Sequence, residues 1–256
     1  MPPLTVLTIQ DLNRSFGGIQ AVSDVSFKVS GGTIKALIGP NGAGKTTLFN
    51  LICGNLPPTS GRIIFKDQAI AGQAAHRIAR LGLARTFQNI KLYPGLSTLE
   101  NVMLGRHSRS HTGFMAAMLN LPRTWREEAD IAEKSYALLK MLNIADLADK
   151  EAMSLAFGQQ RAVEMARALA AEPELLLLDE PAAGLNIYET AELAELISKI
   201  RDMGITILLV EHDMSLVMQI SDEIVVLNFG RKIAEGAPGA IQNNQEVIKI
   251  YLGGDD

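Results

Sequence analysis

The sequence predicts an α/β protein with a mostly parallel β-sheet, an N-terminal antiparallel β portion and an inserted α-helical subdomain. Two observations carry this prediction. Short apolar runs alternate with helical patterns in the first and last thirds of the chain, and continuous apolar runs such as Leu175–Leu178 are typical of strands buried on both faces. From Thr98 to about Ala170, by contrast, only helical patterns occur.

Each element follows from its apolar periodicity and from the glycines and prolines that bound it. The expected strands are Leu4–Gln10, Val25–Val29, Ile34–Ile38, Arg62–Phe65, Leu83–Phe87, Leu175–Leu178, Ile205–Val210, Glu223–Leu227 and Lys232–Ala234. The expected helices are Thr46–Ile52, Ala74–Leu81, Trp125–Leu142, Gln159–Ala170, Tyr188–Ile200, Met214–Ile220 and Ile241–Tyr251. We expect Arg62–Phe65 to lie at a sheet edge, and the last two strands to form a hairpin across Asn228–Gly230.

These elements predict a single domain over residues 1–256. Its core comprises residues 1–88 and 171–256, and residues 89–170 form the helical subdomain. The 24 Lys and Arg against 28 Asp and Glu give a net charge of −4, which argues against a nucleic-acid-binding surface. No apolar run reaches the ~20 residues of a membrane-spanning helix, and the N-terminus does not resemble a secretory signal. The single cysteine, Cys53, excludes an internal disulfide, and we expect a buried thiol in a soluble protein of a reducing compartment.

The segment Gly39–Thr46 (GPNGAGKT) matches the phosphate-loop pattern G-x-x-x-x-G-K-[ST] between a predicted strand and a predicted helix. Its glycines allow the backbone N–H groups to point inward around phosphate oxygens, and the following helix adds its positive dipole end. Lys45 would contact the β- and γ-phosphates, and Thr46 would ligate Mg²⁺. A Gly-rich turn with a solvated lysine is the disfavoured alternative. The fold class is therefore a P-loop NTPase (RecA-like) core, with a nucleotide-binding loop made of Gly39, Pro40, Asn41, Gly42, Ala43, Gly44, Lys45, Thr46 and Thr47.

Two acids, Asp179 and Glu180, follow the apolar run Leu175–Leu178. Ligands bind at the carboxyl ends of the strands in such sheets, so both acids are expected at the nucleotide. Asp179 would hold Mg²⁺ directly or through water, and Glu180 would accept a proton from the attacking water as the general base. Taken alone, the pair could simply begin a solvated loop, and the phosphate loop favours the catalytic interpretation.

Five further features make the chain resemble the ATP-binding subunits of ABC transporters over essentially its whole length. The segment Leu155–Arg161 (LAFGQQR) occupies the place of the ABC signature, Thr86–Gln88 resembles the Q-loop, Ala183–Asn186 the D-loop and Val210–Asp213 the switch region. Phe16 matches the aromatic residue that stacks on adenine.

The resemblance implies a role for each matching residue. Gln88 would touch Mg²⁺ and the attacking water, and His212 would contact the γ-phosphate. On the adenine side, the implied nucleotide contacts are Phe16 and Val22. The residues that would contact ATP held by an opposite subunit are Phe157, Gly158 and Gln159. Considered alone, Gln88 would be an exposed loop amide and His212 a packed histidine. For Phe16, a core position at a strand end is the disfavoured alternative to stacking.

Two departures from the family pattern bear on activity. Ala156 and Phe157 stand where the signature usually has serine and glycine, and Asn186 replaces the usual D-loop aspartate. Losing the serine hydroxyl removes a hydrogen bond to a charged group, worth roughly 1.5–3 kcal/mol. Lys45 and Glu180 are retained, so the resemblance implies an active ATPase whose cofactors are ATP and Mg²⁺.

Within the family, the chain most resembles the ATPases of branched-chain amino acid importers. The stretches Phe16–Val22, Pro181–Asn186 and the insertion Arg106–Glu128 carry this resemblance. Importers of other amino acids or urea and exporters of the lipopolysaccharide type share parts of it. A non-transport ABC ATPase, such as an iron–sulfur cluster assembly type, and a regulatory nucleotide sensor remain alternatives.

The resemblance also implies partners and a location. These are a second ABC ATPase subunit, identical or distinct, placed head to tail, two integral membrane permease subunits and, indirectly, an external solute-binding protein, but no nucleic acid. The chain would be peripheral to the cytoplasmic face of the inner membrane. The permease groove is expected at Tyr93, Pro94, Leu96 and Leu99. The insertion Arg106–Glu128 has either ordinary helix packing with solvated arginines, the favoured interpretation, or a contact with lipid or permease.

Overall fold

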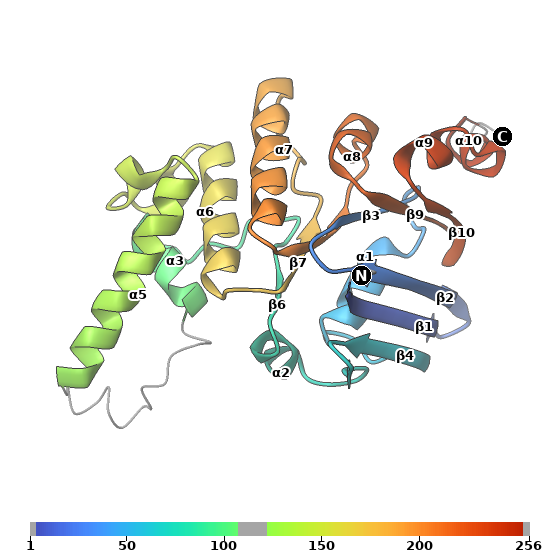
Figure 1. The fold of residues 1–256 in the computed structure, drawn as a ribbon, viewed down its shortest axis with the longest axis horizontal. Helices are drawn as coiled ribbons and strands as arrows, with labels where there is room; N and C mark the ends of the chain where they lie inside the picture. The colour runs from blue at the N-terminus through green and yellow to red at the C-terminus, as the bar shows by residue number, and fades with distance from the viewer. Residues whose placement is uncertain (1–3, 107–121, 253–256) are drawn as a thin grey trace. The chain divides into compact units, whose positions relative to one another are not determined.

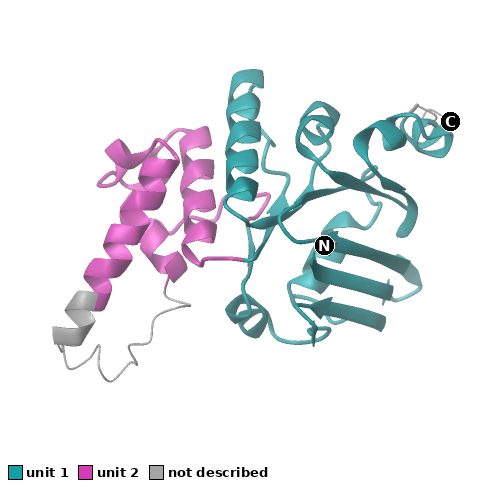
Figure 2. Ribbon diagram, viewed as in Figure 1, with its two compact units in different colours: residues 1–85, 174–256 teal, residues 86–173 magenta. Residues whose placement is uncertain are grey.

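The computed structural model describes residues 4–106 and 122–252 (Figure 1). The chain forms two compact units, coloured separately in Figure 2. We call residues 1–85 with 174–256 the core unit, and residues 86–173 the helical unit. Within the described ranges, no helix is both long enough and apolar enough to cross a membrane.

A six-stranded sheet forms the centre of the core unit. Its strands lie in the order β10-β9-β3-β8-β7-β6, and all neighbours are parallel except β10, which pairs antiparallel with β9. The bounds are β3 (Ile34–Ile38), β6 (Leu83–Arg85), β7 (Leu175–Asp179), β8 (Thr206–Val210), β9 (Glu223–Asn228) and β10 (Arg231–Gly236). Every residue of β3, β7 and β8 is buried, which confirms the predicted parallel sheet.

Helices and a second sheet cover the two faces of this sheet. Leu37 and Val225 pack into a core shared with α1 and the antiparallel strands, whereas Ala36 and Ile224 pack against α8 and α9 on the opposite face. Figure 1 shows α7 and α8 on one side of the sheet and α1 on the other. The helices of the core unit are α1 (Lys45–Ile52), α2 (Ala75–Arg80), α7 (Ile187–Asp202), α8 (Met214–Ile220), α9 (Pro238–Gln242) and α10 (Gln245–Leu252).

The N-terminal strands form an antiparallel sheet in the order β2-β1-β4-β5, made of β1 (Thr5–Phe16), β2 (Ile19–Ser30), β4 (Ser60–Phe65) and β5 (Gln68–Ala69). The prediction that Arg62–Phe65 is an edge strand was wrong, because β5 pairs with its outer side through Ile64 and Phe65. The first two strands are also longer than predicted, because their ladder continues to the turn at Phe16 and Ile19.

The predicted C-terminal helix Ile241–Tyr251 is in fact two helices. A break at Asn243 and Asn244 separates α9 from α10. The side-chain oxygen of Asn244 accepts hydrogen bonds from the backbone N–H groups of Glu246 (2.9 Å) and Val247 (3.2 Å). Asparagine is a strong N-cap residue, so a local side-chain bond overrides the continuous apolar periodicity of the segment.

The helical unit contains α3 (Thr98–Arg106), α5 (Pro122–Met141), α6 (Phe157–Ala170) and the short 3₁₀ turns η2 (Ala145–Leu147) and η3 (Ala152–Ser154). Most of the insertion Arg106–Glu128 lies outside the described residues. Its first residue does not match the expectation of a solvated arginine. Arg106 is buried and its guanidinium donates to Glu172 at 2.9 Å, so it contributes to helix packing.

Cys53 caps the C-terminal end of α1 and is buried, as predicted. Burial raises the pKa of its thiol to about 11, so the reactive thiolate is scarce at neutral pH. We expect a thiol-specific chromogenic disulfide reagent to leave the native protein unlabelled over minutes and to titrate one thiol per chain after denaturation. Rapid labelling of the native protein would contradict the buried position.

Candidate functional site

The loop between β3 and α1 is a glycine-dependent cradle of backbone N–H groups. Gly39 and Gly44 adopt positive φ angles of 152° and 99°. A Cβ at Gly39 would lie 2.2 Å from the Leu227 carbonyl oxygen, and one at Gly44 would lie 2.4 Å from that of Ala21. Only glycine fits at these two positions, so the cradle is fixed between β2 and the end of β9.

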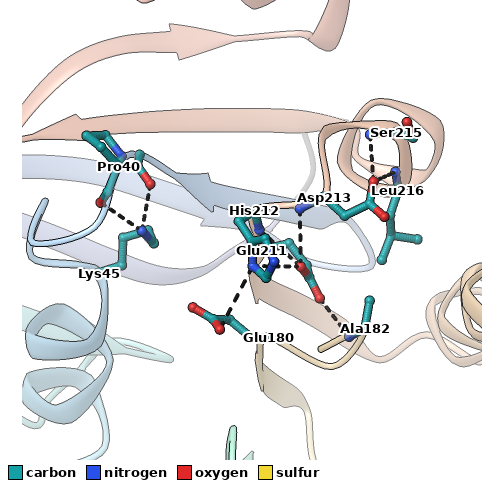
Figure 3. A network of polar contacts seen from close by, with 10 residues as sticks. Pro40, Lys45, Glu180, Ala182, Glu211, His212, Asp213, Ser215 and Leu216 are labelled. Carbon is teal, nitrogen blue, oxygen red and sulfur yellow. Dashed lines mark hydrogen bonds and ion pairs between the residues drawn. The ribbon is translucent and has the colours of Figure 1, made fainter. Parts of the chain in front are cut away.

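Lys45, the first residue of α1, folds back over this loop. Its Nζ donates to the carbonyl oxygens of Gly39 (2.6 Å) and Pro40 (3.0 Å), as Figure 3 shows. Burial lowers the pKa of the ammonium group, while the charges of Glu180 and Asp179 oppose that shift. A desolvated cation held by two neutral carbonyl groups gains strong charge-assisted hydrogen bonds when phosphate oxygens replace them.

Asp179 ends β7, the strand next to β8, and forms a buried ion pair. Its Oδ2 accepts a hydrogen bond from the Arg85 guanidinium at 2.7 Å, and both side chains are buried. Arg85 also donates to Asn50 of α1 at 2.7 Å. Arg85 therefore ties the carboxylate at the end of β7 to the helix that follows the phosphate loop. Sequence reasoning assigned no role to Arg85, although a cation that ends a strand directly before the Q-loop was the available signal.

Glu180 has an unusual backbone conformation. Its φ is +47°, a left-handed value that non-glycine residues rarely adopt. Its N–H donates to Val210 at 2.9 Å, and its carbonyl accepts from Ala183 at 3.1 Å, so both neighbouring segments hold the strained residue. Strain of this kind clusters at functional sites because the surroundings must stabilise it. Here it directs the carboxylate to within 3.9 Å of His212 Nδ1 (Figure 3).

The end of β8 contributes three consecutive polar residues. His212 is mostly exposed, whereas Glu211 is fully buried and accepts hydrogen bonds from three backbone N–H groups. Asp213 caps α8 by accepting from Ser215 at 2.9 Å and Leu216 at 3.1 Å. The sequence prediction named His212 but gave Glu211 no role.

The predicted adenine contacts differ in exposure. Phe16 is partly exposed at the end of β1, and the Arg14 guanidinium lies 4.6 Å from its ring centre, so one aromatic side chain stands at the surface. Val22, by contrast, is fully buried in the apolar core, where its side chain supports β2. Stacking by Phe16 and a nucleotide contact by Val22 both stay predictions.

The remaining predicted site residues belong to the helical unit. The backbone carbonyl groups of Phe87 and Gln88 accept hydrogen bonds from Arg161 at 2.8 and 3.0 Å, which fixes the Q-loop to α6 within this unit. Helix α6 begins at Phe157, two residues earlier than predicted, because Gln159 Oε1 accepts from the Ala156 N–H at 3.2 Å and caps the helix. Phe157 is half exposed at this helix start.

The donor set of the core unit suits Mg²⁺ better than a metal that prefers His and Cys. The described part of the chain has no group of three or more His, Cys, Asp or Glu side chains that could hold a metal ion. What the loops offer instead is the hydroxyl of Thr46, exposed at the start of α1, and the carboxylate of Asp179. Mg²⁺ takes few protein oxygens and completes its shell with water and phosphate oxygens, so these two donors fit.

Comparison with known proteins agrees with this geometry. Residues 22–183 match the family model described as ABC transporter. The chain belongs to the ABC transporter family. Residues 231–256 of this ABC chain also match the model of the branched-chain amino acid ATP-binding cassette transporter. The ABC chain thus carries both the family's ATP-binding core and the C-terminal segment of that subfamily.

Two relatives and one solved structure span nearly the whole ABC chain. The high-affinity branched-chain amino acid transport ATP-binding protein BraF of Pseudomonas aeruginosa is 44% identical, with 97% of this chain and 98% of BraF covered. LivG of Escherichia coli, which bears the same description, is 43% identical over the same shares. A crystal structure of a nucleotide-free ATP-binding cassette from an ABC transporter superposes with a TM-score of 0.84 at 29% identity, covering 97% of this chain and 99% of that one.

The asparagine that departs from the family's D-loop pattern keeps a structural role in this ABC chain. Asn186 Oδ1 accepts hydrogen bonds from the N–H groups of Tyr188 (2.9 Å) and Glu189 (3.1 Å). In turn, the Asn186 N–H donates to the Glu189 carboxylate at 2.8 Å. This capping box starts α7 directly after the D-loop. An amide oxygen makes the same backbone bonds as a carboxylate oxygen, so the substitution leaves the helix start intact.

The buried Arg85–Asp179 pair of this ABC chain allows a stability prediction. Replacing Arg85 by alanine would leave a buried carboxylate without its partner, which is expected to lower the free energy of unfolding by ~3–5 kcal/mol. Urea denaturation followed by circular dichroism measures the change. Arg77→Ala, on the exposed face of α2, is the matched control and should shift stability by less than about 0.5 kcal/mol. Equal losses in both variants would show that the buried pair does not stabilise the fold.

Proposed function

We propose that this chain hydrolyses ATP to drive an importer of branched-chain amino acids. The observation that carries the chemistry is the meeting of Lys45, Glu180 and His212 at the carboxyl ends of three adjacent parallel strands. The observation that carries the substrate is the near full-length similarity to two branched-chain amino acid transport ATP-binding proteins.

In this mechanism, each residue of the core unit has one task. The N–H groups of the phosphate loop surround the phosphate oxygens of ATP, and Lys45 exchanges its two carbonyl partners for the β- and γ-phosphates. Glu180 accepts a proton from the water that attacks the γ-phosphate, and the proton resides on its carboxylate until product release. His212, 3.9 Å from Glu180, orients this group and contacts the γ-phosphate.

Thr46 and Asp179 would hold Mg²⁺, and Gln88 of the helical unit would contact it. When bound, the ion neutralises charge that develops on the β- and γ-phosphates. Arg85 donates to Oδ2 of Asp179, which orients the carboxylate. Gln88 lies in a Q-loop whose backbone is anchored to α6, so its position is set by the helical unit.

The complete site requires a second subunit. The chain has one phosphate loop and one signature segment, and in the proposed head-to-tail dimer Phe157–Gln159 of one subunit cover ATP bound by the other. The exposure of Phe157 at the start of α6 supports this arrangement. Closure and opening of the dimer are then biased by bound nucleotide, and the helical units transmit the movement to two permease subunits at the cytoplasmic face of the membrane.

Reconstitution tests both parts of this proposal. We expect membrane proteins that co-purify with the chain, placed in proteoliposomes with their solute-binding protein, to take up radiolabelled leucine, isoleucine and valine only with internal ATP. A matched preparation without ATP is the control. ATP-dependent uptake of a different solute would overturn the substrate, and absence of hydrolysis in the complete complex would overturn the ATPase role.

A further inference from the structure

Glu211 is a fully buried carboxylate between the two loops that carry Glu180 and His212. Most buried carboxylates are balanced by arginine or lysine. Within the described residues, the hydrogen bonds of Glu211 come instead from backbone N–H groups, and the His212 Nδ1 atom lies 3.8 Å from its Oε2. Burying a carboxylate costs free energy unless hydrogen bonds replace those that it made with water. An apolar side chain would fill the same space without this cost, which indicates that the hydrogen bonds of Glu211 have a role of their own.

The two oxygens of Glu211 serve different loops, as Figure 3 shows. Oε1 accepts from the N–H of Ala182, in the loop after β7, at 2.7 Å. Oε2 accepts from the N–H groups of His212 at 3.0 Å and Asp213 at 3.4 Å, in the loop after β8. A single side chain therefore joins the loop of the general base to the loop of the switch histidine.

The loop after β7 continues from Ala182 into the D-loop and the cap of α7. Leu185 donates to Ala182 at 3.1 Å, and Asn186 then caps the helix. If an opposite subunit displaced the D-loop, the Ala182 N–H would therefore move with it, because the two are joined by this turn. Because Glu211 bonds that N–H on one side and His212 on the other, the displacement would reach the histidine as well.

We propose that Glu211 is a positioning residue that couples the Glu180 loop to the switch histidine, so that the two groups adopt their catalytic positions together. This inference rests on the proposed ATPase function. Among the described residues, no hydrogen bond joins Glu211 to the phosphate loop, so we expect it to act on the rate of hydrolysis and not on nucleotide affinity. Its burial distinguishes it from Glu180, whose carboxylate faces the site.

The first test is a split between turnover and binding. Glu211→Gln keeps one carbonyl oxygen but replaces the other by an NH₂ group, so only one of the two loops keeps an acceptor. We expect kcat to fall about 10–100-fold, since small misplacements of catalytic groups have effects of that size. KM and the affinity for a fluorescent ATP analogue should stay within about threefold of the original chain. Unchanged kcat, or an equal loss of affinity, would overturn the inference.

The second test needs no activity. Hydrogen–deuterium exchange of the nucleotide-free protein is followed in peptides that cover residues 180–186 and 210–214. The amide of Glu211→Gln can turn its single oxygen to either loop, so each loop lacks its acceptor part of the time. Both peptides should therefore exchange faster, while peptides of β3 keep their rate. Faster exchange in only one loop, or in the whole core unit, would overturn the coupling.

Two further variants complete the design. Glu235→Gln on β10 removes a carboxylate that accepts from Lys35 and Lys232, outside the site, and should change neither loop nor kcat. Glu211→Asp keeps the charge but is one methylene too short to reach both loops, so it serves if the glutamine variant fails to fold.

The outcomes for the coupling and for the proposed function are distinguishable. If the unmodified chain shows no hydrolysis while both loops still exchange faster in Glu211→Gln, the proposed function fails and the coupling stands. If it hydrolyses ATP as fast with Glu211→Gln as without, the coupling alone fails.

Discussion

Replacing Glu180 by glutamine is expected to lower kcat for ATP hydrolysis by about 10²–10⁴-fold while ATP binding persists. The amide has nearly the shape of the carboxylate but cannot accept a proton from water. The backbone bonds that hold residue 180 at its left-handed φ of +47° do not involve the side chain, so the loop should keep its form. Release of inorganic phosphate measures turnover, and titration with a fluorescent ATP analogue measures binding.

The control for this variant is Glu192→Gln, an exposed glutamate on α7, which should hydrolyse ATP at the original rate. Near-normal turnover in Glu180→Gln would remove Glu180 from the role of general base. A loss of binding together with turnover would indicate instead that the substitution disturbs the phosphate loop. The Glu180→Gln variant should also favour the closed dimer, because its bound ATP is not hydrolysed.

Local sequence predicted the parts of the site whose residues are neighbours in the chain. The phosphate loop needs glycine at Gly39 and Gly44 because a Cβ at either position would clash with a backbone carbonyl oxygen. A short sequence pattern with glycine at these positions therefore suffices to predict the loop. The strand that ends in Asp179 is likewise a continuous apolar run, so its buried, parallel setting was predictable.

The residues that sequence reasoning missed act across long separations. Arg85 and Asp179 meet only because β6 and β7 are adjacent in the sheet, and Glu211 meets Ala182 only because β7 and β8 are adjacent. Strand order was not predictable from local periodicity, so neither contact was predicted. The single-helix prediction for Ile241–Tyr251 failed for the opposite reason, because a local cap interrupts an apolar pattern that suits a longer helix.

Replacing Lys45 by alanine is expected to weaken ATP binding by at least about 30-fold. The ammonium group is already desolvated, and its two carbonyl partners lie within the loop that would surround the phosphates. Removing one member of a buried, hydrogen-bonded charge pair costs about 2–5 kcal/mol, which corresponds to roughly 30- to 5,000-fold in Kd. The β- and γ-phosphates would also lose the cation that is proposed to contact them, so turnover should fall together with binding.

The same fluorescent titration checks this result, with Lys199→Ala on the exposed side of α7 as the matched control. Both lysines belong to the core unit. If ATP were attracted only nonspecifically by positive charge, both variants would lose ATP affinity to a similar extent. Selective loss in Lys45→Ala indicates a contact with phosphate, since only Lys45 belongs to the loop. Unchanged affinity in Lys45→Ala would refute the assignment of Gly39–Thr46 as the phosphate loop, and with it the positions inferred for Asp179 and Glu180 around bound ATP.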